Sequence, residues 1–334
     1  MKAEQPHFSS VLLQWYGIHG RDLPWRHTRD AYRIWLSEII LQQTRVEQGR
    51  DYWERFVRRW PTVELLAAAT EDEVLREWQG LGYYSRARNL HAAAQQVVAA
   101  GGFPDTVEGL MRLRGVGAYT AAAVASFAFD VPAAVVDGNV YRVLSRYFGI
   151  EVPIDSTEGH RLFAAMAQEL IPADRAADYN AAVMDFGATQ CTPASPGCAM
   201  CPLAETCAAR AAGNVASLPV KQGRTHVQER RLAYIYIRCK GEVAIRRRGA
   251  GDFWQGLWEP VLVEEGGEAL LEGTLLLASG VKHVLSHRKL LCDFYLAEPK
   301  EKPALPAGYI WVKEEALDAY AKPRLIERLL QRLP

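Results

Sequence analysis

The sequence lacks any uninterrupted apolar run of about eighteen residues, the length that a membrane-spanning helix requires. Its first residues also lack the basic segment and apolar stretch of a secretory signal, so we expect a cytoplasmic protein without a membrane span. Neither sign of charge is in excess, because 39 lysines and arginines balance 39 aspartates and glutamates. Net charge therefore excludes no class of partner, and local clusters have to be examined. At 334 residues, 49% of them hydrophobic, the chain is long enough for about two globular domains.

The pattern of apolar and polar residues changes once along the chain. Up to residue 217, apolar residues recur at spacings of three and four, which predicts helices. From residue 231 short β-rich runs predominate, such as Leu232 to Ile237. Residues 218–230 have the composition of a linker. We therefore predict a helical domain over 1–217 and a smaller α+β domain over 231–334.

Cysteine is scarce, and its distribution is informative. Four of the six cysteines fall within seventeen residues, while Cys239 and Cys292 stand alone and have the character of small buried apolar residues. In a reducing compartment such a cluster indicates a metal site rather than disulfides. Four thiolates suit either a zinc ion or a 4Fe-4S cluster, but zinc ribbons usually contain two C-x2-C pairs and this segment has one. The predicted ligands are Cys191, Cys198, Cys201 and Cys207.

A glycine-containing turn is predicted between two helices at residues 113–120. Gly115, Val116 and Gly117 would turn the chain tightly and present backbone N–H groups beside a helix N-terminus, which is a site for an anion such as phosphate. Glycines also close many ordinary turns between helices. The following residues, 121–129, carry no charge, so that helix should be buried except at its N-terminal end.

Two carboxylates have sequence surroundings that suit acid–base chemistry. Glu38 has apolar neighbours on adjacent helical turns, and desolvation there would raise its pKa and make it a general acid. An ordinary surface glutamate is the alternative. Asp137 precedes a predicted helix, and it or Asn139 would cap the N-terminus, although capping alone could explain both. A capping carboxylate is held ionised by the backbone N–H groups. Carboxylates with opposed pKa shifts are typical of glycosidic bond cleavage.

Taken together, these residues resemble adenine DNA glycosylases of the MutY type, in the helix-hairpin-helix superfamily that includes endonuclease III. The resemblance covers nearly the whole chain and rests on the four cysteines and six motifs. These are LPWR (23–26), WLSEIILQQTRV (35–46), GLGYYSRARNL (80–90), LRGVGAYTA (113–121), VVDGNV (135–140) and KHVLSH (282–287).

The resemblance implies a mainly α fold. It comprises a six-helix barrel lobe at about 30–135 and a lobe from 1–29 and 136–217 that holds one 4Fe-4S cluster. A C-terminal Nudix-like domain for 8-oxoguanine recognition follows over 231–334. That domain lacks a stretch matching G-x5-E-x7-R-E-x2-E-E, so we expect no Nudix hydrolysis.

The resemblance also implies the activity and its residues. A monomer would remove adenine opposite 8-oxoguanine or guanine from double-stranded DNA and leave an abasic site. Glu38 would protonate N7 of the adenine and Asp137 would stabilise the sugar cation, with support from Tyr119 and Asn139. The residues expected to contact DNA or the lesion are Arg26, Gln43, Thr44, Leu81, Gly82, Tyr83, Gly115, Val116, Gly117, Ser286 and His287. Leu285 replaces the phenylalanine usual in the lesion-reading loop.

Two alternatives remain open from the sequence. An endonuclease III-like lyase would need a lysine where Tyr119 stands, because tyrosine cannot form a Schiff base. A non-catalytic iron–sulfur DNA-binding protein would leave Glu38 and Asp137 unexplained. In addition, eight basic residues between Arg224 and Arg248 form either a strip that faces phosphates or a charged strand edge.

Overall fold

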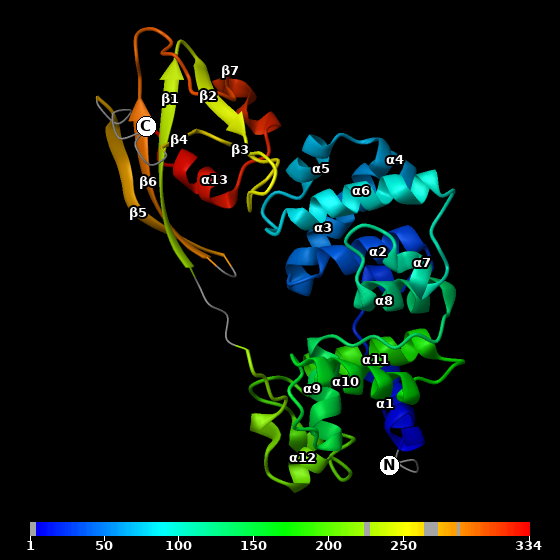
Figure 1. Ribbon diagram of the computed structural model, residues 1–334. Coiled ribbons are helices and arrows are strands. Elements are labelled where there is room, and N and C mark those ends of the chain that lie inside the picture. Colours follow the sequence, from blue (N-terminus) through cyan, green and yellow to red (C-terminus); the bar gives the residue numbers. More distant parts are fainter. Residues whose placement is uncertain (1–4, 224–227, 264–272, 286–287) are drawn as a thin grey trace. The chain divides into compact units, whose positions relative to one another are not determined.

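The computed structural model describes residues 5–223, 228–263, 273–285 and 288–334 (Figure 1). Its contacts divide the chain into two compact units. The first comprises 1–53, 62–64 and 93–223, and the second comprises 54–61, 65–92 and 224–334. The predicted change from helices to strands is confirmed, because helices predominate up to Ser217 and strands begin at Gln228. The predicted lobe boundaries stay a prediction.

Helices form the first unit. They are α1 (Gln5–His19), η1 (Pro24–Arg26), α2 (Ala31–Ile40), the start of α3 (Val46–Arg59), the end of α6 (Ser85–Ala99), α7 (Val107–Met111), α8 (Ala118–Phe129), α9 (Gly138–Phe148), α10 (Thr157–Leu170), α11 (Ala176–Thr189), η2 (Cys198–Met200), α12 (Ala208–Ala211) and η3 (Val215–Ser217). As predicted, α8 is buried, from Thr120 through Phe127. It packs against α2, while α11 packs against α1 and α9.

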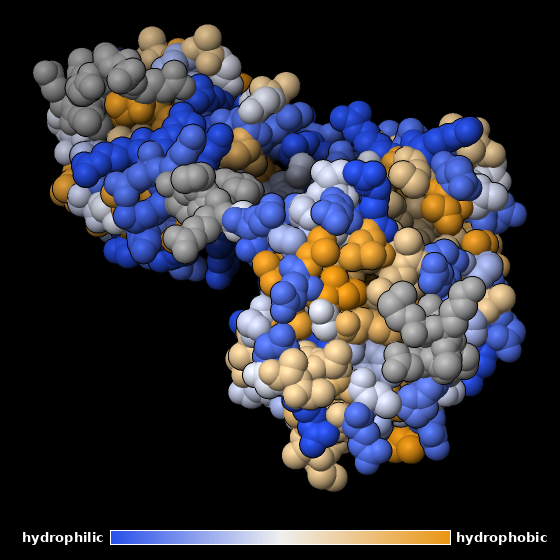
Figure 2. Space-filling view, turned by 60° about the horizontal axis from the view of Figure 1, so that its bottom comes forward, coloured by the Kyte–Doolittle hydropathy of each residue, from blue (hydrophilic) through white to orange (hydrophobic). Residues whose placement is uncertain are grey.

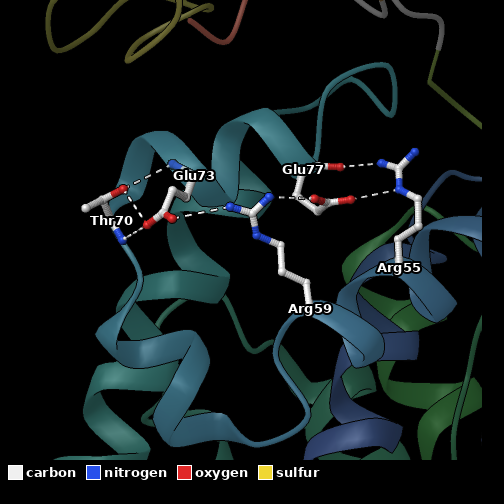
Figure 3. A network of polar contacts seen from close by, with 5 residues as sticks. All are labelled: Arg55, Arg59, Thr70, Glu73 and Glu77. Atoms are coloured by element: carbon white, nitrogen blue, oxygen red, sulfur yellow. Dashed lines mark hydrogen bonds and ion pairs between the residues drawn. The ribbon is translucent and has the colours of Figure 1, made fainter. Parts of the chain in front are cut away.

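The helical part of the second unit is held by a network of charges (Figure 3). Helix α5 (Glu71–Glu77) begins with a capping box, in which Thr70 and Glu73 each accept a backbone hydrogen bond from the other. From the end of α3, the Arg59 guanidinium contacts Glu73 at 3.3 Å and Glu77 at 3.1 Å. Arg55 contacts Glu77 at 2.8 Å. These contacts fix α5 beside α3, directly before the turn at residues 78–84. A short helix, α4 (Val63–Ala68), precedes α5.

A mixed sheet forms the rest of the second unit. Its strands are β1 (Gln228–Cys239), β2 (Glu242–Arg247), β3 (Trp258–Glu259), β4 (Val261–Val263), β5 (Leu275–Leu285), β6 (Arg288–Ala297) and β7 (Tyr309–Lys313), followed by η5 (Glu314–Ala319) and α13 (Arg324–Leu330). The described strands lie in the order β3-β2-β1-β6-β5, with β4 paired to β1 and β7 to β2. Only β1 and β6 pair in parallel among them.

Alternation along the strands explains the two buried faces of this sheet. In the middle of β1 and β6, even-numbered residues such as Tyr234 and Phe294 are fully buried, and the buried face of α13 includes Leu325 and Leu329. On the other face, Ile235 belongs to a separate apolar cluster. The predicted C-terminal helix with Pro323 at its start is confirmed.

The predicted linker is shorter than residues 218–230. Leu218 is 2% exposed, and Val220 accepts a backbone hydrogen bond from Ile154 at 3.0 Å. The Asp155 carboxylate accepts hydrogen bonds from the backbone N–H groups of Gln222 and Gly223. The segment up to Gly223 therefore belongs to the first unit, and β1 begins at Gln228.

Within the second unit, contacts between residues far apart in the sequence join residues 65–92 to the C-terminal part of the chain. Arg247 reaches Glu71 and Asp72, each at 2.9 Å. The Gln79 amide donates to Glu327, and Arg88 donates to the carbonyl oxygen of Gln255 at 2.6 Å.

The surface shows no helix suited to a bilayer. Within the part of the chain that the structure describes, no helix is both long and apolar enough to cross a membrane. Figure 2 shows a face on which hydrophilic residues predominate, interrupted by separate apolar patches.

Candidate active site

Glu38 lies on the buried side of α2 in the first unit. The helix begins at Asp30, whose side chain caps it by accepting a hydrogen bond from the backbone N–H of Tyr32 at 2.9 Å. Because apolar side chains surround this part of the helix, the Glu38 side chain is also buried and is only 7% exposed. The expectation of a desolvated carboxyl is therefore confirmed, and the alternative of a surface glutamate is wrong.

The Tyr119 hydroxyl donates a hydrogen bond to Oε2 of Glu38 at 2.9 Å. Burial raises the pKa of Glu38, while the charge of Arg26 and the hydrogen bond from Tyr119 act to lower it and Asp137 raises it further. The net shift is upward, which favours the protonated acid. Burial and the nearby carboxylates raise the pKa of Tyr119 as well, so its hydroxyl remains a neutral donor.

Asp137 is the N-cap of α9, as the sequence predicts. Its Oδ1 accepts hydrogen bonds from the backbone N–H groups of Asn139 and Val140, each at 2.8 Å. Its Oδ2 accepts from Nδ2 of Asn139 at 2.8 Å. Three donors thus fix the carboxylate at a helix N-terminus, where a negative charge is favourable. Its charge acts on both Glu38 and Tyr119, so these three side chains lie within electrostatic range of one another.

Arg26, at the end of η1, borders the same site. Its guanidinium lies 4.6 Å from the ring centroid of Phe127, and its positive charge acts on Glu38. Nη1 of Arg26 is buried and has no hydrogen-bond partner in the structure. A buried donor without a partner is costly, so this N–H group is available to a ligand.

Gln43 and Thr44 follow α2. Gln43 is exposed and has a φ of 57°, a left-handed backbone conformation that residues other than glycine rarely adopt. Thr44 is anchored at the turn, with its backbone N–H 3.2 Å from the carbonyl oxygen of Leu41. The turn therefore projects Gln43 outward from the end of the helix that carries Glu38.

The glycine turn has the predicted form. Gly115 has a φ of 76° and Gly117 is the N-cap of α8 without a side-chain cap, while Val116 is buried beneath them. Gly115 and Gly117 are exposed. The N-terminal N–H groups of α8 therefore face outward, as an anion site requires.

Sequence reasoning missed the arginine that connects this site to its surroundings. Nη2 of Arg142 donates to Oδ1 of Asn139 at 2.8 Å and to the carbonyl oxygen of Gly187 at 2.6 Å, and its Nε donates to the carbonyl oxygen of Cys191 at 2.8 Å. The available signal was the helical spacing of Arg142 and Arg146, four residues apart directly after VVDGNV.

The four predicted thiols lie around one cavity of about 30 Å³. All are free and partly exposed, and Cys239 and Cys292 are buried elsewhere, as expected. Within the described ranges, no group of three or more His, Cys, Asp or Glu side chains is arranged to hold a single metal ion. Four thiols around one cavity are the donor set that a 4Fe-4S cluster takes.

The charges beside this cavity also fit an anionic occupant. Arg146 is 2% exposed, and its guanidinium donates to the carbonyl oxygens of Thr192 and Pro193 and lies 3.5 Å from Sγ of Cys191. Arg142 is buried as well and is likewise bonded to carbonyl and amide oxygens. Two buried cations that lack a carboxylate in ion-pair contact favour a negatively charged group nearby.

The remaining predicted contacts lie in the second unit. Gly80, Gly82 and Tyr83 have φ values of 99°, 74° and 47°, so the turn is left-handed even at a tyrosine. Nε1 of Trp78 donates to the carbonyl oxygen of Gly82 at 3.0 Å, which holds the turn. Leu81 is buried, whereas Tyr83 is 45% exposed. The Arg86 guanidinium lies 5.5 Å from the Tyr83 ring centroid. Ser286 and His287 lie outside the described residues.

Two family models match the chain. Residues 36–168 match the HhH-GPD superfamily of base excision DNA repair proteins, and residues 233–332 match the NUDIX domain. Among curated proteins, the adenine DNA glycosylase of Buchnera aphidicola subsp. Schizaphis graminum is 32% identical over 254 residues, covering 75% of this chain and 73% of that protein. That of Mycolicibacterium smegmatis is 44% identical, covering 60% of this chain and 69% of that protein. The chain belongs to the adenine DNA glycosylase family.

Other members of this family are longer. The mouse adenine DNA glycosylase is 44% identical over 234 residues, but the alignment covers 66% of this chain and only 45% of the mouse protein. The chain thus spans less than half of this relative.

Solved structures agree with the fold of the family. A thermostable thymine-DNA glycosylase is 31% identical and superposes with a TM-score of 0.59, covering 63% of this chain and 98% of that one. A non-covalent endonuclease III–DNA complex has a TM-score of 0.56 at 23% identity, covering 64% and 98%. The helical fold is therefore that of the helix-hairpin-helix glycosylases, as predicted, and it is followed by an α+β NUDIX domain.

Proposed function

We propose that this chain is a monofunctional adenine DNA glycosylase. It hydrolyses the N-glycosidic bond of adenine opposite 8-oxoguanine or guanine in double-stranded DNA and leaves an abasic site. The proposal is carried by the shared site of Glu38 and Asp137, in which one carboxyl is pushed toward its protonated form and the other is fixed by three donors. It also rests on membership of the family.

The reaction begins when the adenine has left the base stack, because its glycosidic bond is inaccessible within a duplex. Protonated Glu38 gives its proton to N7 of the adenine, and the bond between N9 and C1′ breaks as adenine leaves with the electron pair. The carboxylate of Asp137 stabilises the positive charge on the sugar. Water then adds to C1′, and its proton returns to Glu38.

Tyr119 and Asn139 are positioning residues in this scheme. The Tyr119 hydroxyl fixes the Glu38 carboxyl, and Asn139 fixes Oδ2 of Asp137. Because Tyr119 stands where a lyase needs an amine, the strand remains uncut. Borohydride should therefore trap no covalent adduct between this enzyme and an abasic duplex.

The same proposal covers contacts with DNA. The exposed turn at Gly115 and Gly117 binds backbone phosphate, Gln43 and Tyr83 enter the duplex, and Arg26, Thr44, Leu81 and Gly82 border the lesion or the adenine. Ser286 and His287 hydrogen-bond 8-oxoguanine. For His287→Ala we expect a larger loss with adenine opposite 8-oxoguanine than with adenine opposite guanine.

The cysteine cavity is proposed to hold one 4Fe-4S cluster on Cys191, Cys198, Cys201 and Cys207. When bound, the cluster cross-links the loops of residues 191–207. Metal analysis of the purified protein should give about four irons per chain and a broad visible absorption. One zinc per chain in a colourless protein would contradict this part of the proposal.

The activity is tested by single-turnover release of adenine from a duplex with adenine opposite 8-oxoguanine, beside duplexes with adenine opposite guanine and opposite thymine. We expect release from the two mispairs and an abasic strand that breaks only on alkali treatment. For Asp137→Asn we expect a loss of about 10²–10³-fold with duplex binding retained.

A matched control is Asp130→Asn, because Asp130 is exposed at the end of α8 and pairs with Arg29. It should excise adenine at the wild-type rate. Full activity in Asp137→Asn, or release of thymine glycol instead of adenine, would refute the proposed function.

A further inference from the structure

A cavity of about 600 Å³ lies within the second unit, beside the turn that carries Tyr83. Its volume is in the range of ligand sites. Besides Leu81 and Tyr83, it is lined by aromatic and basic side chains of the sheet domain. These include Phe253, Trp254, His283 and Arg288. All of its lining residues are among those that the structure describes.

Three guanidinium groups surround the Phe253 ring. Those of Arg288, Arg248 and Arg230 lie 5.0, 5.4 and 6.0 Å from its centroid. Each guanidinium is attracted only modestly to the ring face. The repulsion between the positive charges is stronger, because water is partly excluded from their surroundings. Such a cluster of cations therefore needs negatively charged partners, and the three arginines differ in whether they have a carboxylate in contact.

Arg248 is already neutralised. Its guanidinium is 4% exposed and pairs with Glu259 and Asp252. Asp252 also accepts the backbone N–H of Trp254 at 2.9 Å, which fixes the loop that presents Phe253. Arg248 therefore stabilises the loop through Asp252.

Arg230 and Arg288 have no such partner. Neither is in ion-pair contact with a carboxylate among the described residues, although the charge of Arg230 acts on Asp252. On the opposite face of the same strands, Lys289 pairs with Glu229 at 2.7 Å. Arg231 and Lys282 also act on Glu229, so the basic groups near Lys289 share one carboxylate, whereas Arg230 and Arg288 have none in ion-pair contact among the described residues.

The strand register places both cations on one face of the strand pair. Gln228 pairs with Arg288 and Arg230 with Leu290, so residues 228, 230, 288 and 290 share a face. Leu290 is fully buried on this face, and beyond it Arg288 lines the cavity while Arg230 is exposed beside the Phe253 ring. Two residues of strand separate them, about 6.7 Å along the strand direction.

The other basic groups at the cavity add little charge. Burial lowers the pKa of His283, which favours its neutral form, and Arg324 pairs with Glu327 at 3.1 Å. Four of the eight basic residues of the strip expected between Arg224 and Arg248 likewise have carboxylate partners. Arg238, Arg246, Arg247 and Arg248 all pair with carboxylates.

We propose that Arg230 and Arg288, held beside Phe253, bind two phosphates of the DNA strand that passes the Tyr83 turn. The inference rests on the proposed function, because it takes duplex DNA as the ligand. It assigns to this end of the sheet a sequence-independent contact, distinct from reading of the oxidised base.

The test measures duplex affinity across a range of salt concentrations. The probe is a fluorescent duplex with 8-oxoguanine opposite a 2′-fluoro-deoxyadenosine, in which the fluorine destabilises the sugar cation and slows cleavage. Each phosphate contact contributes about 0.9 to the slope of log affinity against log salt. For Arg230→Gln/Arg288→Gln we expect the slope to fall by about 1.8 and affinity at 0.1 M salt to fall roughly 60-fold.

The matched control is Arg238→Gln/Lys313→Gln. It removes the same charge from the same unit, but both residues pair with carboxylates, Arg238 with Glu298 and Lys313 with Glu315. Its slope should equal that of wild type. The charge-retaining variant Arg230→Lys/Arg288→Lys should restore most of the wild-type slope, and an undamaged duplex should show the same losses.

Single-turnover excision at saturating enzyme separates this inference from the proposed function. The Gln variant should then excise at the wild-type rate, because the reacting groups lie in the first unit. If wild type excises and the Gln variant keeps the wild-type slope, the phosphate site is wrong. A loss confined to the 8-oxoguanine duplex would also overturn it, whereas a wild type without excision refutes the proposed function instead.

Discussion

Single residues set the chemistry of the first unit through burial. A helix that places Glu38 among apolar side chains gives the carboxyl no water to stabilise its charge, so the pKa rises. The unfolded chain has no such surroundings. The same residue therefore makes stability depend on pH, and in the proposed function it does the same for excision.

The first prediction concerns stability. Because the folded pKa of Glu38 lies above its unfolded value, the folded state holds the proton more tightly, and stability falls as pH rises from the unfolded pKa through the folded one. Glu38→Gln cannot ionise, so it should unfold at a higher temperature than wild type at pH 8. The difference should shrink at pH 4, measured by thermal unfolding. An equal difference at both pH values would contradict the assigned protonation.

The second prediction concerns Tyr119→Phe. The hydrogen bond from Tyr119 stabilises the Glu38 carboxylate and acts to lower its pKa. Its removal should shift the alkaline fall of the excision rate to higher pH, while the less well positioned acid lowers the maximum rate. A pH–rate profile under single-turnover conditions checks both. The control Tyr141→Phe removes a hydroxyl that bonds His160 on an exposed surface and should leave the profile unchanged.

At the scale of elements, the position of Asp137 depends on how α9 packs against α11. Gly187 of α11 lies against Asn139, and a Cβ at residue 187 would come within 2.6 Å of the Asn139 Cβ and 3.0 Å of its carbonyl oxygen. Real Cβ atoms do not approach so closely, so one helix has to move.

The third prediction follows from this contact. Gly187→Ala should displace the first turn of α9, lower stability by about 1–3 kcal/mol and slow excision, since Asp137 moves with that turn. Gly17→Ala is the matched control, because a Cβ there meets nothing within 4 Å on α1. It should excise normally and be stabilised by about 0.5–1 kcal/mol. Equal behaviour of the two variants in unfolding and single-turnover assays would show that the α9–α11 contact is unimportant.

Much of the element scale could be predicted from the sequence. The buried α8, the cap at Asp137, the turn at Gly115 and the C-terminal helix all follow from local patterns of apolar, polar and glycine residues. Arg142 and Arg146 could not be assigned in this way. Most of their partners are carbonyl oxygens 45 or more residues away, and a backbone carbonyl has no sequence signature.

At the scale of the whole molecule, the division into units differs from the order of the chain. Residues 65–92 lie in the helical half of the sequence, yet they belong to the unit of the C-terminal sheet. The contacts responsible join residues such as Gln79 and Glu327, which are 248 positions apart. No local periodicity reports such a contact, which is why sequence reasoning placed these residues with the other helices.

The fourth prediction tests this grouping by hydrogen exchange. Leu329→Ala removes a fully buried side chain of α13 and should destabilise its unit by about 2–5 kcal/mol. Exchange should then rise at residues 71–92 as well as in the sheet, but not in α8 or α9. Phe163→Ala, equally buried in α10, should give the reverse pattern. If both variants affected α8 alike, the two units would not unfold independently.

The turn at Tyr83 has a consequence for the encounter with a duplex. Trp78 and two glycines hold it in its unusual backbone shape in the protein alone. The chain there loses its freedom during folding, so little further ordering remains when a target is met. In the proposed function, a projecting turn that is already formed lets the protein examine many base pairs in brief contacts. The residence time at each base pair should then reflect how easily the DNA duplex opens there.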